Sequence, residues 1–204
     1  MSELLAEQQR LPIGSVGHAS LGWWGALCLI ATEASLFAYG LFAYFYFAVQ
    51  LDGNWWPTQS PSFAVSLPSI IILILSSVAI GWGDRGARLG IQRQVLVGFG
   101  AALALGCVFL LLQLVEWGRQ PFTLRSSGYG SAYFTLNGLH IAHLIGGLIM
   151  LLLLLLWSAL GYFDAVRNAP LLIGAVIWHF IVVMGVAIFV TFYIAPYLWG
   201  SPWH

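Results

Sequence analysis

The sequence predicts an all-α integral membrane protein with five transmembrane helices, the N-terminus inside and the C-terminus outside (N-in/C-out). Hydrophobic residues make up 60% of the chain and charged residues only 7%, whereas a soluble domain carries about 25% charged residues. Five apolar runs are each long enough to cross a bilayer, which takes about 20 residues in a helix. A membrane domain of consecutive helices is therefore expected.

The first two helices are expected over about residues 23–49 and 65–82. An Asp-Gly-Asn tripeptide follows the first run and a Gly-Asp-Arg-Gly segment follows the second, and both compositions favour turns. Pro68 falls near the start of the second helix, where proline is tolerated because the first N–H groups of a helix have no partner within it. Residues 1–22 are expected to form a cytoplasmic N-terminal segment.

The other three helices are expected over about residues 95–117, 133–162 and 171–199, which completes a single domain over residues 23–200. A Gln-Pro dipeptide follows the third run, and an Asn-Ala-Pro tripeptide precedes the fifth. Pro196 lies near the end of the last run, where it is expected to kink or end the helix because proline lacks a backbone donor.

The distribution of arginine sets the expected orientation, since cytoplasmic loops carry an excess of positive charge. With the N-terminus inside, five arginines fall on the cytoplasmic side and two on the outer side. The inner set is Arg10, Arg85, Arg88, Arg93 and Arg167, and the outer set is Arg119 and Arg125. The formal net charge of zero gives no long-range field that would favour a nucleic acid partner.

Glu33 lies about eleven residues into the first run, which is roughly 16 Å along a helix and close to the bilayer centre. A carboxylate at that depth is costly, so Glu33 is expected to be protonated or paired. Two interpretations stay open: a structural hydrogen bond between helices, and a role in proton handling or lipid contact. We expect Glu33 to be protonated and hydrogen-bonded at neutral pH.

His140 and His143 lie at a similar depth in the fourth run, three residues apart and therefore on one helix face. A contact between Glu33 and these rings is expected. His179 lies in the fifth run, nearer the cytoplasm. A metal site built from Glu33, His140 and His143, or a haem held with His179, is chemically allowed. Histidines satisfied by structural hydrogen bonds are the favoured interpretation.

Gln113 and Glu116 lie three residues apart near the outer end of the third run and share a face. A salt bridge between Glu116 and Arg119 at the membrane surface is the simplest expectation, and a helix or partner contact is the alternative. Glycine is frequent in the third and fourth runs, where small residues permit close helix contact. Trp55, Trp56 and Trp117 are among the residues expected to mark the outer interface.

Several of these residues together resemble the cytochrome c oxidase subunit III family. The Gly-x-His-x-x-His pattern that ends at His143 is similar to the signature of that family. The other matching segments, in the same order along the chain, are Thr32-Glu33 with Leu36-Phe37, Glu116 followed by Pro121-Phe122-Thr123, Tyr129-Gly130-Ser131 with Phe134, and Trp178-His179-Phe180. Larger members have seven helices, so the resemblance implies a short bacterial form that lacks the first two.

The resemblance implies a non-redox accessory subunit III of a haem-copper terminal oxidase in the bacterial inner (cytoplasmic) membrane. It implies oxidase subunits I and II as partners, with the haems and copper in those subunits and no cofactor in this chain. The implied role is to stabilise the catalytic subunit, bind phospholipid and support proton uptake in aerobic respiration. Many members place an aspartate where this chain has Val182, so any role of that acid does not transfer.

No catalytic, cofactor-binding or metal-binding residue is assigned from the sequence. The candidates for structural, lipid-related or proton-related roles are Glu33, Gln113, Glu116, His140, His143 and His179. Two alternatives stay open: a subunit III-like component of a nitric oxide reductase system, and a small proton channel or transporter that uses Glu33 and the histidines as a relay.

Overall fold

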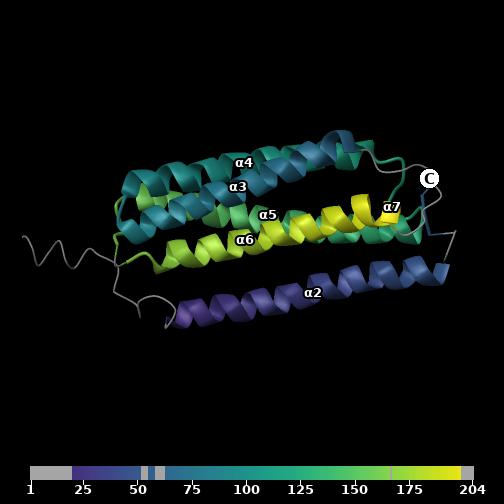
Figure 1. Ribbon diagram of the computed structural model, residues 1–204, viewed down its shortest axis with the longest axis horizontal. Coiled ribbons are helices and arrows are strands. Elements are labelled where there is room, and N and C mark those ends of the chain that lie inside the picture. Colours follow the sequence, from purple (N-terminus) through teal and green to yellow (C-terminus); the bar gives the residue numbers. More distant parts are fainter. Residues whose placement is uncertain (1–19, 52–54, 58–62, 166, 199–204) are drawn as a thin grey trace, which may run out of the picture.

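The computed structural model describes residues 20–51, 55–57, 63–165 and 167–198 (Figure 1). Its five long helices are apolar enough to cross a membrane, which confirms the predicted all-α membrane fold. The first four are α2 (Leu21–Leu51), α3 (Phe63–Leu89), α4 (Gln92–Arg119) and α5 (Gly128–Ala159). The fifth contains α6 (Ala169–Phe189), a π-helical segment η3 (Val190–Ile194) and a last short piece α7 (Ala195–Leu198). Most of the expected N-terminal segment, residues 1–19, lies outside the described residues.

Helix α3 extends beyond its expected end at residue 82 and stops only at Leu89. The additional turns carry Asp84 and Arg88, whose side chains form an ion pair of 3.0 Å one helical turn apart. Hydropathy marks where a helix leaves the apolar layer, and polar residues continue the helix beyond that point. The turn into α4 is tight because Gly90 adopts a positive φ of 70°, which glycine tolerates best.

Consecutive helices run antiparallel, and α2 lies along one side of the bundle (Figure 1). Helices α3 and α4 lie on the opposite side, with α5 and α6 between them and α2. Helix α3 packs most extensively on α4, whereas α2 has its main contacts with α5 and α6. Only 11% of the most apolar window of α2 is buried, compared with 50% in the last helix. Helix α2 therefore presents most of its surface away from the rest of the chain.

Glycines set how closely the helices approach one another. A Cβ atom on Gly98 of α4 would lie only 2.5 Å from the Cα atom of Gly83 on α3, so the two backbones are in direct contact. The Trp178 ring of α6 lies against Gly106 of α4 and Gly147 of α5, where added Cβ atoms would lie 2.7 and 3.1 Å from the ring. Small residues thus permit close packing within this bundle, as expected for membrane helices.

Aromatic side chains form a separate buried cluster around the start of α5. Trp55 belongs to it: the residue is only 1% exposed and its ring centroid lies 5.4 Å from Tyr44 and 6.0 Å from Tyr129. Trp55 is thus part of the aromatic core of the chain, and its expected position at the level of the outer interface stays a prediction. Tryptophan fits an interface and an aromatic core equally well, and sequence composition does not separate the two.

The last helix widens just before Pro196 instead of ending there. Proline has no N–H group, so the carbonyl of Phe192 receives no hydrogen bond from position 196. The Tyr129 hydroxyl donates weakly to that carbonyl at 3.5 Å. The N–H of Ala195 instead reaches back five residues to the carbonyl of Val190, which is the π-helical pattern. The helix then continues to Leu198.

Candidate functional site

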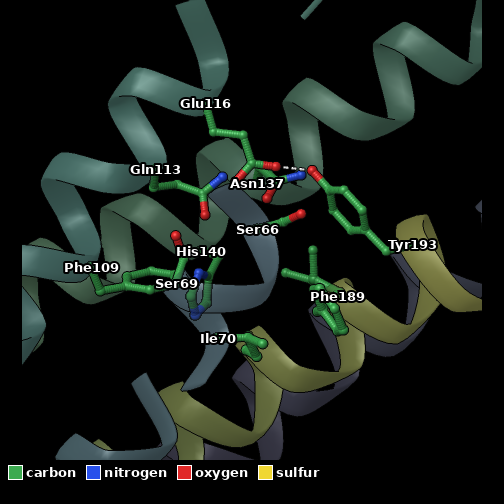
Figure 2. Close-up of a pocket in the computed structure, with 12 residues that line it drawn as sticks. Ser66, Ser69, Ile70, Phe109, Gln113, Glu116, Asn137, His140, Phe189 and Tyr193 are labelled. Atoms are coloured by element: carbon green, nitrogen blue, oxygen red, sulfur yellow. Dashed lines mark hydrogen bonds between the residues drawn. The ribbon is translucent and has the colours of Figure 1, made fainter. Parts of the chain in front are cut away.

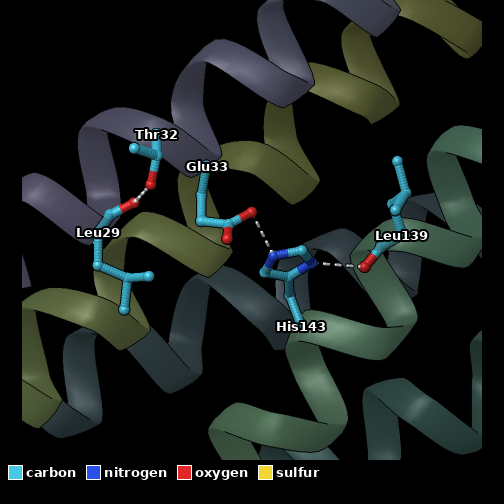
Figure 3. Close-up of polar contacts among 5 residues, drawn as sticks. All are labelled: Leu29, Thr32, Glu33, Leu139 and His143. Carbon is cyan, nitrogen blue, oxygen red and sulfur yellow. Dashed lines mark hydrogen bonds and ion pairs between the residues drawn. The ribbon is translucent and has the colours of Figure 1, made fainter.

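Glu33 of α2 and His143 of α5 form the polar contact expected between the first and fourth helices (Figure 3). The distance from Glu33 Oε2 to His143 Nε2 is 2.9 Å. The other ring nitrogen, Nδ1, lies 2.7 Å from the carbonyl oxygen of Leu139. Because a carbonyl only accepts, Nδ1 carries a hydrogen and donates it.

This arrangement restricts the charge of the Glu33–His143 pair. With Nδ1 already a donor, either Glu33 donates its proton to a neutral ring, or a doubly protonated ring donates to a carboxylate. The pair has no net charge in either case. A hydrogen-bonded neutral pair is far less costly inside a membrane than an isolated carboxylate. The expectation that Glu33 itself holds the proton stays a prediction.

An open apolar groove of about 420 Å³ lies beside the pair, between α2, α5 and α6. Glu33 and His143 contribute to its wall, and their side chains are 29% and 25% exposed. The rest of the wall is mainly apolar, with residues such as Met150 and Ile177. A second apolar groove, of about 530 Å³, lies between α2 and the N-terminal half of α5. Two apolar spaces therefore follow one another along α2.

His140 and His143 form hydrogen bonds with different helices. The His140 side chain is buried, and its Nε2 atom lies 3.1 Å from the carbonyl oxygen of Ile181 on α6. Side chains three residues apart in an α-helix point in directions that differ by roughly 60° around the helix axis. This difference is enough to aim the two rings at different helices. The metal site considered for Glu33, His140 and His143 is therefore not assembled, and the described residues contain no group of three or more such side chains placed for a metal ion.

His179 of α6 faces yet another helix. Its Nδ1 atom lies 2.6 Å from the Ser77 hydroxyl of α3. His143, His140 and His179 thus point toward α2, α6 and α3, respectively. Val182 is buried in the apolar core on the same helix as His179.

Glu116 is buried in the interior of the bundle, at 4% exposure. Its Oε1 atom accepts a hydrogen bond from the Tyr193 hydroxyl and a longer one, at 3.4 Å, from the Tyr133 hydroxyl. The Gln120 amide donates to the Tyr133 hydroxyl at 3.0 Å. The expected surface salt bridge to Arg119 is therefore wrong: the Glu116 side chain turns inward, and tyrosine hydroxyls take the place of the arginine.

Sequence reasoning missed the tyrosine and asparagine members of this interior network. Tyr133, Asn137 and His140 lie on one face of α5, at spacings of four and three residues, and that pattern inside an apolar run was a usable signal. Tyr193 gave no such signal, since it lies within the π-helical segment η3, where side chains do not follow the spacing of an α-helix. Gln113, as expected, shares the buried face of Glu116 and lines the same cavity.

The loop between α4 and α5 holds one end of this network. The Ser127 hydroxyl accepts a hydrogen bond from the N–H of Gly130 at 3.0 Å and so caps α5. The N–H of Thr123 donates to the Ser126 hydroxyl at 3.1 Å, and that hydroxyl donates back to the Thr123 carbonyl at 2.8 Å. Gly130 packs directly under the Thr123 carbonyl, where a side chain has no room.

Comparison with known proteins agrees with the segments that suggested the family. The model of the family described as "Cytochrome c oxidase subunit III" matches residues 19–201. The chain is 30% identical to cytochrome c oxidase subunit 3 of Locusta migratoria over 185 residues, which cover 87% of this chain and 69% of the relative. Over the same shares of both chains, it is 28% identical to the subunits of Danio rerio and Pan troglodytes. The chain belongs to the cytochrome c oxidase subunit III family.

Proposed function

We propose that this chain is a non-redox accessory subunit III of a haem-copper terminal oxidase. Membership of the family implies a complex with other oxidase subunits. In this proposal the partners are subunits I and II, which carry the haems and copper, and this chain holds no redox cofactor. It stabilises the catalytic subunit, binds phospholipid and supports proton uptake during aerobic respiration.

The Glu33–His143 pair beside the open apolar groove is the observation that carries the lipid part of the proposal. Intramembrane ionisable groups that are neither buried nor isolated mark functional positions. The grooves of about 420 and 530 Å³ that follow one another along α2 are open and apolar, which suits acyl chains. Since α2 contacts the bundle through a small surface, lipid and a neighbouring subunit would complete its packing.

The placement of arginine supports the proposed N-in/C-out orientation in a bacterial inner membrane. Arginines near the turn from α3 to α4 and before α6 gather at one end of the bundle, and those at the end of α4 and in the loop after it lie at the other. The first group is Arg85, Arg88, Arg93 and Arg167, and the second is Arg119 and Arg125. The richer end would face the cytoplasm.

The test is purification of the complex in mild detergent through a tag on this chain. We expect a haem spectrum, a large catalytic subunit and a copper-bearing second subunit, with phospholipid retained in the mass spectrum of the intact complex. Glu33→Gln should release part of that lipid and hasten the loss of oxidase activity over repeated turnover. Ser35→Ala is the matched control, because Ser35 is on the same helix and its hydroxyl donates to the Ala31 carbonyl of its own turn.

Other outcomes of the same purification would overturn the proposal in a recognisable way. Recovery of a nitric oxide reductase core, without a copper-bearing subunit, would assign the chain to that system. A colourless chain that purifies alone and conducts protons in liposomes would favour the small channel. Equal lipid retention in wild type and Glu33→Gln would refute the lipid role and leave the subunit assignment intact.

A further inference from the structure

The second carboxyl oxygen of Glu116 has an unusual environment. Oε1 accepts from Tyr193 and Tyr133, but Oε2 is buried and has no hydrogen-bond partner among the described residues. Buried polar atoms in folded proteins almost always have a partner, either a protein group or an ordered water. The described residues supply no such partner for Oε2, which leaves an ordered water as the simplest one.

A small polar cavity adjoins Glu116, enclosed by α3, α4, α5 and α6 (Figure 2). Its volume is about 20 Å³, and one water molecule needs roughly 10–15 Å³ on this measure. The space is too small for an organic ligand. The polar residues that line it are Ser66, Ser69, Gln113, Glu116, Asn137, His140 and Tyr193.

Two amide side chains supply the additional groups that a bound water needs. Gln113 extends from α4 toward Glu116 and Asn137, and its amide can donate a hydrogen bond (Figure 2). Asn137 uses its Nδ2 atom to donate to the Tyr133 carbonyl at 2.9 Å, which leaves its side-chain oxygen as an acceptor. A water here can thus accept from Gln113 and donate to both Glu116 and Asn137. Buried waters typically make about three such bonds.

We propose that this cavity is a water-binding site, in which one ordered water donates a hydrogen bond to Glu116 Oε2. The water completes a continuous polar network through the bundle interior, from Gln113 through Glu116 and the two tyrosines to Gln120. The site is independent of the grooves around α2 and of the proposed lipid role, since it uses other residues and lies on the opposite side of α5 and α6 from α2.

The direct test is a density map of the complete oxidase complex at a resolution that shows ordered solvent. We expect a solvent peak at about 2.6–3.2 Å from Glu116 Oε2 and within the same range of Gln113 or Asn137. An empty cavity in a map that shows other buried waters would overturn the proposal. A side chain of a neighbouring subunit bonded to Oε2 would overturn it as well.

Infrared spectroscopy of the same complex gives a second test that does not depend on the map. The Glu116 carboxyl bands are identified by their loss in Glu116→Gln. We expect them to shift in Gln113→Leu, because this substitution removes a partner of the water. Gln94→Leu is the matched control, since its amide bonds the Trp82 carbonyl at the other end of α4. Glu116 bands that are identical in wild type, Gln113→Leu and Gln94→Leu would refute the bound water.

Discussion

The indole nitrogen of Trp178 donates a hydrogen bond of 3.1 Å to the Ser76 hydroxyl, and this contact joins α6 to α3 in the middle of the bundle. The Ser76 hydroxyl in turn donates to the Leu73 carbonyl at 2.6 Å, so it is satisfied both as donor and as acceptor. Both side chains are fully buried. The indole ring fits between Gly106 and Gly147, which makes Trp178 the residue through which four helices meet.

Trp178→Phe should destabilise the bundle because it removes the indole donor and leaves unfilled space between Gly106 and Gly147. We expect a loss of about 2 kcal/mol in the free energy of unfolding, combining a lost hydrogen bond with a cavity. Denaturant unfolding of the chain in detergent micelles measures it. Trp82→Phe, at an exposed position on α3, is the control and should change little. Equal effects at the two positions would contradict the central role of Trp178.

The Glu33–His143 contact should appear as a coupling energy between the two side chains. In a double-mutant cycle with Glu33→Ala and His143→Ala, we expect a coupling of about 1–2 kcal/mol, at the upper end of membrane hydrogen bonds because the pair shares a proton. The cycle uses the free energies of unfolding, in detergent micelles, of wild type, the two single variants and the double variant. The same cycle between Ser35 and His143 should give a coupling near zero. Additive effects of Glu33→Ala and His143→Ala would show that the pair contributes no net stability.

Gly98→Ala should separate α3 from α4. The new Cβ atom would lie 2.5 Å from the Gly83 Cα atom and 2.8 Å from the Ala79 carbonyl oxygen, and neither backbone group can move without displacing its helix. Overpacking of this kind costs about 1–3 kcal/mol, which thermal unfolding of the purified complex would report. Gly118→Ala on the same helix meets nothing within 4 Å and should be neutral or stabilising, because alanine favours helix. Similar losses at both sites would contradict the direct backbone contact.

The fold was predictable because its main determinant is local. Each apolar run is long enough to cross a bilayer, and a helix is the structure that satisfies its backbone there. The contact between Glu33 and His143 was predictable for the same reason: depth follows from position along a helix, and a costly carboxyl group at mid-membrane needs a partner.

The direction in which each polar side chain points around its helix axis was much less predictable. His140 and His143 share a face on a three-residue spacing, yet they reach different helices because a small rotation suffices when neighbours are close. Glu116 looked like a surface residue, since Arg119 follows one turn later, but its burial depends on Tyr193, which is distant in sequence. Tertiary contacts determine these side-chain directions, and such contacts cannot be inferred from a single sequence.

The π-helical segment before Pro196 should be what brings Tyr193 to Glu116. Pro196→Ala restores an N–H group that can donate to the Phe192 carbonyl, so the helix can return to regular α geometry. Return of η3 to α geometry would change the direction of the side chains within it, which would move Tyr193 away from Glu116. We therefore expect Tyr193→Phe to cost about 1 kcal/mol in the wild-type background and almost nothing in the Pro196→Ala background.

The measurement is denaturant unfolding, in detergent micelles, of wild type, Tyr193→Phe, Pro196→Ala and the double variant. It gives the cost of Tyr193→Phe in each background. Pro170→Ala supplies the matched background, because Pro170 lies in the first turn of α6, where no helix donor is needed. Tyr193→Phe should keep its full cost there. An equal cost of Tyr193→Phe in the Pro196→Ala and Pro170→Ala backgrounds would show that Tyr193 reaches Glu116 without the π-helical segment. The geometry of η3 would then be a consequence of packing, and the missing donor of Pro196 would not be its cause.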